Sequence, residues 1–179
     1  MNSGNTQLVD YGIQNENSDF RVHVCPLAKC VYVYPTFCGV RAIKSGKYRK
    51  VPVYTNGVET AQGYIVPYSK IENCVAVELL DRTWEEANIL ESLSEQEKGA
   101  RAEALIVKIL QLGFLPLPQT AIVVTDAETQ IAGGDILASS TEKKIQVKCD
   151  FKGGGQGDIN RCTGNLFLQI AECNPNSTH

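Results

Sequence analysis

Histidine is scarce in this 179-residue chain, which contains only His23 and His179. A serine triad needs a histidine base beside its nucleophile, and two isolated histidines give little basis for one. The glycine-rich fingerprints of dinucleotide-binding and P-loop proteins are also missing from the sequence. We therefore expect neither triad hydrolysis nor the chemistry of those two nucleotide-binding classes.

Long apolar runs are missing as well, since none approaches the roughly 18 residues that a membrane-spanning helix needs. The first residues lack the basic and then apolar pattern of a signal peptide. From these two features we expect a cytoplasmic protein with no membrane partner. Seven cysteines is an odd number, so in a reducing compartment we expect no disulfide framework.

Four possible zinc ligands lie near one another in the sequence, namely His23, Cys25, Cys30 and Cys38. Their pattern, His-x-Cys-x4-Cys-x7-Cys, lacks the tight paired spacing of ordinary zinc knuckles. We interpret them as strand and turn residues and do not expect zinc there. A zinc-stabilised structural protein stays open as an alternative.

The pattern of residues divides the chain into three parts. Residues 1–18 are polar and predict a flexible N-terminus. Residues 19–90 form a β-rich region, because short β-prone runs between Phe20 and Leu80 alternate with turn signals such as Asn56-Gly57. These strands could form a small antiparallel sheet or barrel, or they could extend the sheet of the third part, residues 91–179.

The third part opens with a capping signature. Ser94-Glu95-Gln96-Glu97 fits Ser/Thr-x-x-Glu and predicts a helix that runs to Gly113. A similar signature at residues 83–86 predicts a short helix over residues 85–90. On the long helix, Glu103 shares a stripe with Ile106 and Leu110. A carboxylate beside apolar side chains is costly without a partner, so Glu103 is either paired to a lysine or functional.

A β-hairpin is expected to follow. Asp135 begins one short strand, and Lys143 to Asp150 alternates apolar and polar residues like a half-buried strand. Side chains two apart on a strand share a face, so Gln146 and Lys148 point together, away from Ile145. The hairpin would bring Asp135 beside them, which groups a carboxylate, an amide oxygen and an ammonium.

This ordered set, Glu103, Asp135 and then Gln146-Val147-Lys148, resembles the PD-(D/E)XK nuclease superfamily. The gap of 146 − 135 = 11 positions suits its hairpin. The likeness covers about residues 94–173, and it departs from the usual motif at Gly134, which replaces proline, and at Gln146, which replaces an acid.

The resemblance implies an α/β (α+β) protein with a restriction-endonuclease-like mixed β-sheet core flanked by helices, preceded by the β-rich region. It also implies an Mg²⁺- or Mn²⁺-dependent endonuclease that hydrolyses DNA, most simply double-stranded DNA. Glu103, Asp135, Gln146 and the carbonyl of Val147 would hold the metal. Lys148 would orient the attacking water.

The net charge of −3 gives no global basic footprint for nucleic acid. Local clusters still suggest DNA-binding residues, because affinity depends on local phosphate contacts. They are Lys44, Lys47, Arg49, Lys50, Lys143, Lys144, Lys152 and Arg161. Cutting both strands needs two sites, so we expect a homodimer or another even-numbered oligomer. The main alternative is a catalytically inactive module of the same fold that binds nucleic acid or a protein partner.

Overall fold

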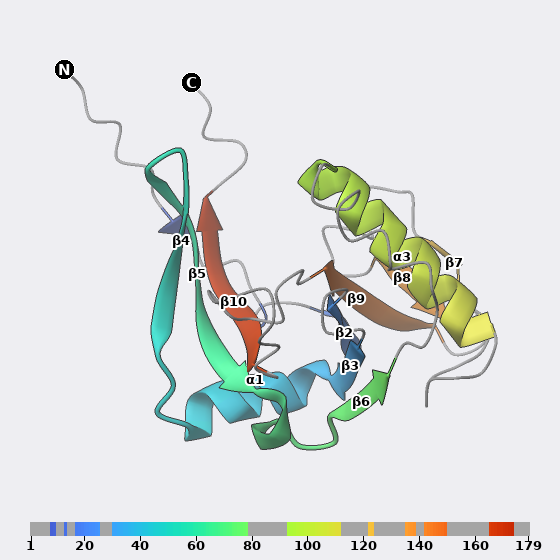
Figure 1. Ribbon diagram of the computed structural model, residues 1–179. Coiled ribbons are helices and arrows are strands. Elements are labelled where there is room, and N and C mark those ends of the chain that lie inside the picture. The colour runs from blue at the N-terminus through green and yellow to red at the C-terminus, as the bar shows by residue number, and fades with distance from the viewer. Residues whose placement is uncertain are drawn as a thin grey trace.

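In a computed structural model, the chain is a mixed α+β protein (Figure 1). The structure describes residues 8–9, 13, 17–25, 30–78, 93–111, 122–123, 135–138, 142–149 and 165–173. Two sheets and two α-helices make up most of the described part. No helix in the described ranges is both long enough and apolar enough to cross a membrane.

The larger sheet has six strands in the order β6-β3-β2-β9-β8-β7. Their bounds are β2 (Phe20–Cys25), β3 (Cys30–Pro35), β6 (Val75–Glu78), β7 (Ile122–Val123), β8 (Ile136–Ala138) and β9 (Lys143–Cys149). The β2 and β9 strands are parallel, whereas the other neighbours are antiparallel, so the sheet is mixed. Three strands that come before residue 90, β2, β3 and β6, therefore extend the sheet that contains the predicted hairpin.

The smaller sheet has four strands in the order β1-β10-β5-β4. They are β1 (Leu8–Val9), β10 (Asn165–Cys173), β5 (Val58–Pro67) and β4 (Lys50–Thr55). The expected turn at Asn56-Gly57 joins β4 to β5, and both residues have positive φ angles of 52° and 79°. Such angles suit a two-residue hairpin turn and explain the asparagine and glycine at these positions.

Parts of the first 18 residues belong to this smaller sheet and to the core beneath it. Leu8–Val9 pairs with β10, and Ile13 is only 1% exposed. The backbone N–H of Ile13 donates to the carbonyl oxygen of Gln169 at 2.9 Å. The segment expected to be flexible is thus attached to the fold at Leu8–Val9 and at Ile13.

Helix α1 (Thr36–Ser45) was not expected within the strand-rich region. It begins directly after Pro35, the last residue of β3, and buries Cys38 and Ala42. A Cβ atom on Gly39 would lie 2.7 Å from the Ile13 side chain and 2.8 Å from that of Tyr34. Glycine therefore lets the helix approach these side chains closely, and this tertiary contact outweighs the modest helix propensity of the segment.

Helix α3 (Glu95–Gln111) opens as its capping signature predicted. The backbone N–H of Ser94 donates to Glu97 Oε2 at 2.8 Å, and the N–H of Glu97 donates back to Ser94 Oγ at 3.3 Å. These reciprocal bonds satisfy donors that the first turn leaves unpaired. The expected end at Gly113 and the expected helix over residues 85–90 lie outside the described residues.

The six-stranded sheet is the middle layer of three (Figure 1). One of its faces packs against α3 through a buried cluster that includes Val22, Val24, Ile106, Ile145 and Val147. Its other face meets the four-stranded sheet and α1 through a second cluster, formed by residues such as Tyr34, Cys38, Val66 and Leu168. The sheet that carries the hairpin is thus covered on both faces, which accounts for its deep burial.

Candidate functional site

The predicted hairpin is present, and its register places Asp135 opposite Gln146. Ile136 pairs with Ile145, Leu137 with Lys144 and Ala138 with Lys143. Asp135 directly precedes β8, and its backbone N–H donates to the carbonyl oxygen of Ile145 at 3.0 Å.

The carboxylate of Asp135 continues the pairing with β9 beyond the end of the ladder. Its Oδ2 atom accepts the backbone N–H of Val147 at 2.8 Å and the side-chain Nε2 of Gln146 at 2.6 Å. A carboxylate only accepts hydrogen bonds, so the amide nitrogen of Gln146 faces Asp135. The amide oxygen Oε1 of Gln146 is not used in this bond. The N–H and C=O of one strand residue point to the same side, which puts the carbonyl of Val147 on the Asp135 side.

Alternation along β9 separates the core residues from the site residues, as the sequence predicted. Ile145 and Val147 are 0% and 7% exposed and pack in the α3 cluster. Gln146 is buried and Lys148 is half-buried. Because successive strand residues alternate, these two side chains leave the sheet on the opposite face.

Glu103 lies on α3 and is half-buried. Its pKa is raised above the usual value, mainly because burial disfavours the charged carboxylate and also because Asp135 is negatively charged; Lys148 acts in the opposite direction. Mutual influence of this kind requires the three groups to be near one another. Glu103 therefore lies within electrostatic reach of Asp135 and Lys148, and Asp135 is hydrogen-bonded to Gln146.

Two further residues from β2 stand beside this group, and sequence reasoning did not assign either of them to it. In the parallel pairing, Arg21 is the partner of Gln146 and His23 is the partner of Lys148. Arg21 is 2% exposed and His23 is 1% exposed. Polar residues at alternate positions of a β-prone run were the available signal, but nothing local indicated that β2 lies next to β9.

His23 is held as a neutral imidazole. Its Nε2 atom is 2.9 Å from the hydroxyl oxygen of Tyr34, and the two rings stack with centroids 5.6 Å apart. Burial lowers the pKa of His23 well below its usual value, and the positive charges of Arg21 and Lys148 lower it further. The pKa of His23 therefore depends on the charges of Arg21 and Lys148 as well as on burial.

A pH-dependent stability follows from this neutral histidine. Unfolded His23 takes up a proton near its usual pKa of 6.5, whereas folded His23 stays neutral well below that pH. Protons therefore favour the unfolded chain, and the free energy of unfolding should fall by up to about 1.4 kcal/mol for each pH unit below 6.5. Urea unfolding between about pH 7.5 and 5 measures this slope. We expect His23→Gln to reduce it and His179→Gln to leave it unchanged; equal slopes in all three proteins would contradict the assignment.

The cysteines of the possible zinc set have other surroundings. Cys25 and Cys38 are buried in the cluster between the two sheets. Burial raises the pKa of the Cys30 and Cys38 thiols, which favours the protonated thiol over the metal-binding thiolate. No three His, Cys, Asp or Glu side chains gather into a metal-binding group within the described ranges.

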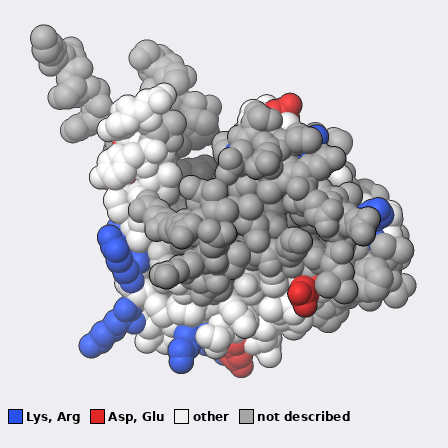
Figure 2. Space-filling model, viewed as in Figure 1, with Lys and Arg blue, Asp and Glu red and all other residues white. Residues whose placement is uncertain are grey.

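The predicted DNA-binding residues fall into separate places. Lys44, Lys47, Arg49 and Lys50 are exposed. Figure 2 shows Lys and Arg side chains gathered at the lower left, where α1 ends and β4 begins, far from α3 in this view. Lys143 forms an ion pair with Asp19 at 2.9 Å. The backbone N–H of Lys144 also donates to Asp19. Lys152 and Arg161 lie outside the described residues.

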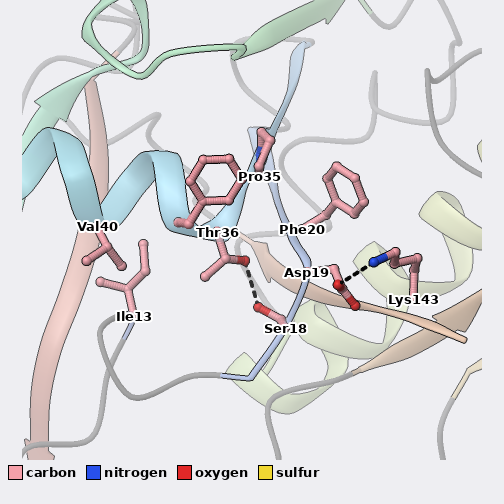
Figure 3. Close-up of a pocket in the computed structure, with 9 residues that line it drawn as sticks. Ile13, Ser18, Asp19, Phe20, Pro35, Thr36, Val40 and Lys143 are labelled. Atoms are coloured by element: carbon pink, nitrogen blue, oxygen red, sulfur yellow. Dashed lines mark hydrogen bonds and ion pairs between the residues drawn. The ribbon is translucent and has the colours of Figure 1, made fainter.

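A hollow of about 520 Å³ lies at the start of β9, beside Lys143 (Figure 3). Its lining includes none of Glu103, Asp135, Gln146 and Lys148. Its polar lining residues are paired with one another: Ser18 and Thr36 share a hydrogen bond of 2.9 Å, and Lys143 forms an ion pair with Asp19. The hollow is thus distinct from the site around Asp135.

No family model, curated protein or solved structure matches this chain. The geometry of its own residues is therefore the basis for assigning a function.

Proposed function

We propose that the chain is a metal-dependent endonuclease that hydrolyses DNA phosphodiester bonds, with a restriction-endonuclease-like core. One observation supports this most: of the four residues that the motif names in order along the chain, Glu103 is within electrostatic reach of Asp135 and Lys148, and Asp135 is hydrogen-bonded to Gln146.

The donors at this site suit Mg²⁺ or Mn²⁺. Glu103 and Asp135 offer carboxylate oxygens, Gln146 offers its Oε1 atom and Val147 its carbonyl oxygen, and hard divalent cations prefer such oxygen ligands. Burial raises the pKa of Glu103, and the negative charge of Asp135 raises it further, so a bound cation would favour ionisation of both carboxylates. Bound there, such an ion would activate a water molecule and offset negative charge on the phosphate.

The residues themselves would position the reaction. Asp135 is oriented by its bonds to Gln146 and Val147, so its carboxylate is fixed before any ligand arrives. Lys148 would donate a hydrogen bond to the attacking water or to a phosphate oxygen. Hydrolysis then breaks the P–O bond to the leaving oxygen while the water forms the new P–O bond; the water loses a proton to solvent, and the leaving oxygen takes one up from solvent.

A second candidate is a nucleic-acid-binding module without catalysis. It is favoured by Gln146, because the amide gives the site one charge less than an acid would, and a weaker cation site follows. Lys148 would then contact a phosphate, or the site would serve a protein partner.

Cleavage of supercoiled plasmid DNA separates these two functions. We expect nicked or linear product with Mg²⁺ or Mn²⁺, and no product when a chelator is in excess. Gel-shift binding under the same conditions shows whether DNA is bound at all. Binding without cleavage over a range of divalent ions would instead identify the non-catalytic module.

The substitution Gln146→Glu tests the metal-binding role of this position. In the parent, Nε2 of Gln146 donates to Asp135 at 2.6 Å, so a carboxylate there would replace an attraction by a repulsion. A divalent cation relieves that repulsion, and we expect Gln146→Glu to bind Mg²⁺ about tenfold or more tightly. Isothermal titration measures the affinity, with the isosteric exposed change Gln96→Glu on α3 as the control. Unchanged or weaker binding in Gln146→Glu would exclude Gln146 from the metal shell.

Cutting a duplex on both strands takes two such sites. A two-fold homodimer, or another even-numbered assembly, would supply them with matching geometry. We propose that double-stranded DNA spans two copies of Asp135 in this way, whereas a monomer would produce only nicks in each binding event.

A further inference from the structure

The β2 strand places two basic side chains on the same face as Gln146 and Lys148. Arg21 is the register partner of Gln146, and His23 is the partner of Lys148. Both are almost completely buried, at 2% and 1% exposure. Removing a guanidinium and an imidazole from water costs free energy, and apolar residues would serve a purely structural strand better. The burial of these two residues therefore points to a specific role at the site beside them.

Charge balance gives Arg21 such a role. Glu103 and Asp135 bring two carboxylates to the site, and Lys148 supplies one positive charge. Arg21, next to Gln146, supplies a second charge that does not depend on pH, because a guanidinium stays protonated. Two carboxylates and two cations leave the buried group without excess negative charge before a ligand binds.

His23 differs from Arg21 because one end of its ring is anchored and the other is not. Nε2 lies 2.9 Å from the hydroxyl of Tyr34, and the Tyr34 ring stacks on the imidazole. The Nδ1 atom is buried and has no hydrogen-bond partner among the described residues. Buried histidines that serve structure alone usually have hydrogen bonds at both ring nitrogens. The unpaired Nδ1 atom of His23, on the strand residue that pairs with Lys148, therefore indicates a polar contact made during function.

We propose that Arg21 and His23 are positioning residues of the Glu103–Asp135–Gln146–Lys148 site, with Tyr34 fixing His23 so that its unpaired Nδ1 atom can hold the Lys148 side chain during the reaction. This inference rests on the proposed nuclease function for its catalytic consequence. Arg21 and His23 touch neither water nor phosphate in this scheme. They act through Gln146 and Lys148, and Tyr34 acts through His23.

Tyr34→Phe is the most selective variant, because it removes only the hydroxyl that anchors His23. We expect kcat for DNA cleavage to fall about tenfold or more, as is typical when a residue that orients a site residue is lost, with DNA affinity changed less than about twofold. Tyr32→Phe is the matched control, since Tyr32 is also buried on β3 and is the strand neighbour of His23. It should keep the parental kcat. His23→Gln should resemble Tyr34→Phe, and parental kcat in both would overturn the inference.

Imidazole ¹⁵N NMR gives a readout that does not depend on cleavage. With ¹⁵N-histidine labelling only His23 and His179 contribute signals, so each can be followed separately. We expect Lys148→Gln, Arg21→Gln and Tyr34→Phe to shift the His23 nitrogen signals and to leave those of His179 and the circular dichroism spectrum unchanged. Unshifted His23 signals in Lys148→Gln would overturn the inference even if the parent cleaves DNA. If the variants shift the His23 signals but the parent cleaves no DNA with any divalent ion, the coupling between these residues is supported and the nuclease function is rejected.

Discussion

Replacing Asp135 by asparagine, or Lys148 by alanine, should reduce DNA cleavage by at least about a hundredfold while the protein stays folded. The Asp135→Asn change keeps the size of the side chain, and its amide oxygen could still accept the N–H of Val147, which Asp135 now accepts at 2.8 Å. It removes the negative charge that a divalent cation needs. Lys148→Ala removes the ammonium that we assign to the attacking water or the phosphate. Initial rates on supercoiled plasmid measure both losses.

Two controls separate a site effect from a general one. Asp19→Asn removes a carboxylate at the other end of β9, where Asp19 pairs with Lys143. Lys108→Ala removes a lysine from the last turn of α3, the helix that carries Glu103. Both controls should cleave at rates near the parental one. Parental cleavage by Asp135→Asn or by Lys148→Ala would show that the catalytic residues lie elsewhere.

Ile145→Ala should cost about 2–5 kcal/mol in the free energy of unfolding, the usual range for emptying a well-packed site. Ile145 is 0% exposed, pairs with Phe20 on one side and with Ile136 on the other, and packs in the α3 cluster. It also adjoins Gln146, so the cavity would loosen the contact between α3 and β9. We expect the variant to cleave more slowly even at temperatures where it is folded, because Glu103 and Asp135 would no longer be held at a fixed separation.

Urea denaturation measures this loss of stability. Val53→Ala is the comparison, because Val53 lies on the edge strand β4 and is 37% exposed. Its free energy of unfolding should change by less than about 0.5 kcal/mol. A loss below about 1 kcal/mol for Ile145→Ala would mean that the packing of α3 on β9 is less tight than the structure indicates.

Local patterns in the sequence are sufficient to predict several elements of this protein. The capping signature at Ser94 and Glu97 depends on residues three apart, so it predicted the start of α3 correctly. Asn56-Gly57 predicted its hairpin turn because the required φ angles are a property of the two residues themselves. Alternation along Lys143–Cys149 likewise separated Ile145 from Gln146, since strand side chains alternate wherever the strand lies.

Helix α1 shows where local pattern was insufficient. Thr36–Ser45 has only ten residues, and isolated helices of that length are marginal in water. Its stability comes from burying Cys38, Gly39 and Ala42 against Ile13 and Tyr34. Those partners lie outside the helix, so the sequence of the segment alone does not predict that it is helical.

The sequence by itself determined the order and the chemistry of the candidate site, namely an acid on a helix, then an acid and an amide-x-lysine pair on a hairpin. Only the tertiary structure decided that Glu103 lies within the electrostatic reach of Asp135 and Lys148, and that β2 lies parallel to β9. Parallel strands are joined by long connections, and here Arg21 and its partner Gln146 are 146 − 21 = 125 positions apart. Pairing over such a distance is set by how the two buried clusters pack on the faces of the six-stranded sheet, and residue-by-residue patterns carry no record of it. For that reason Asp135 and Lys148 were accessible to sequence reasoning, whereas the neighbouring Arg21 and His23 were not.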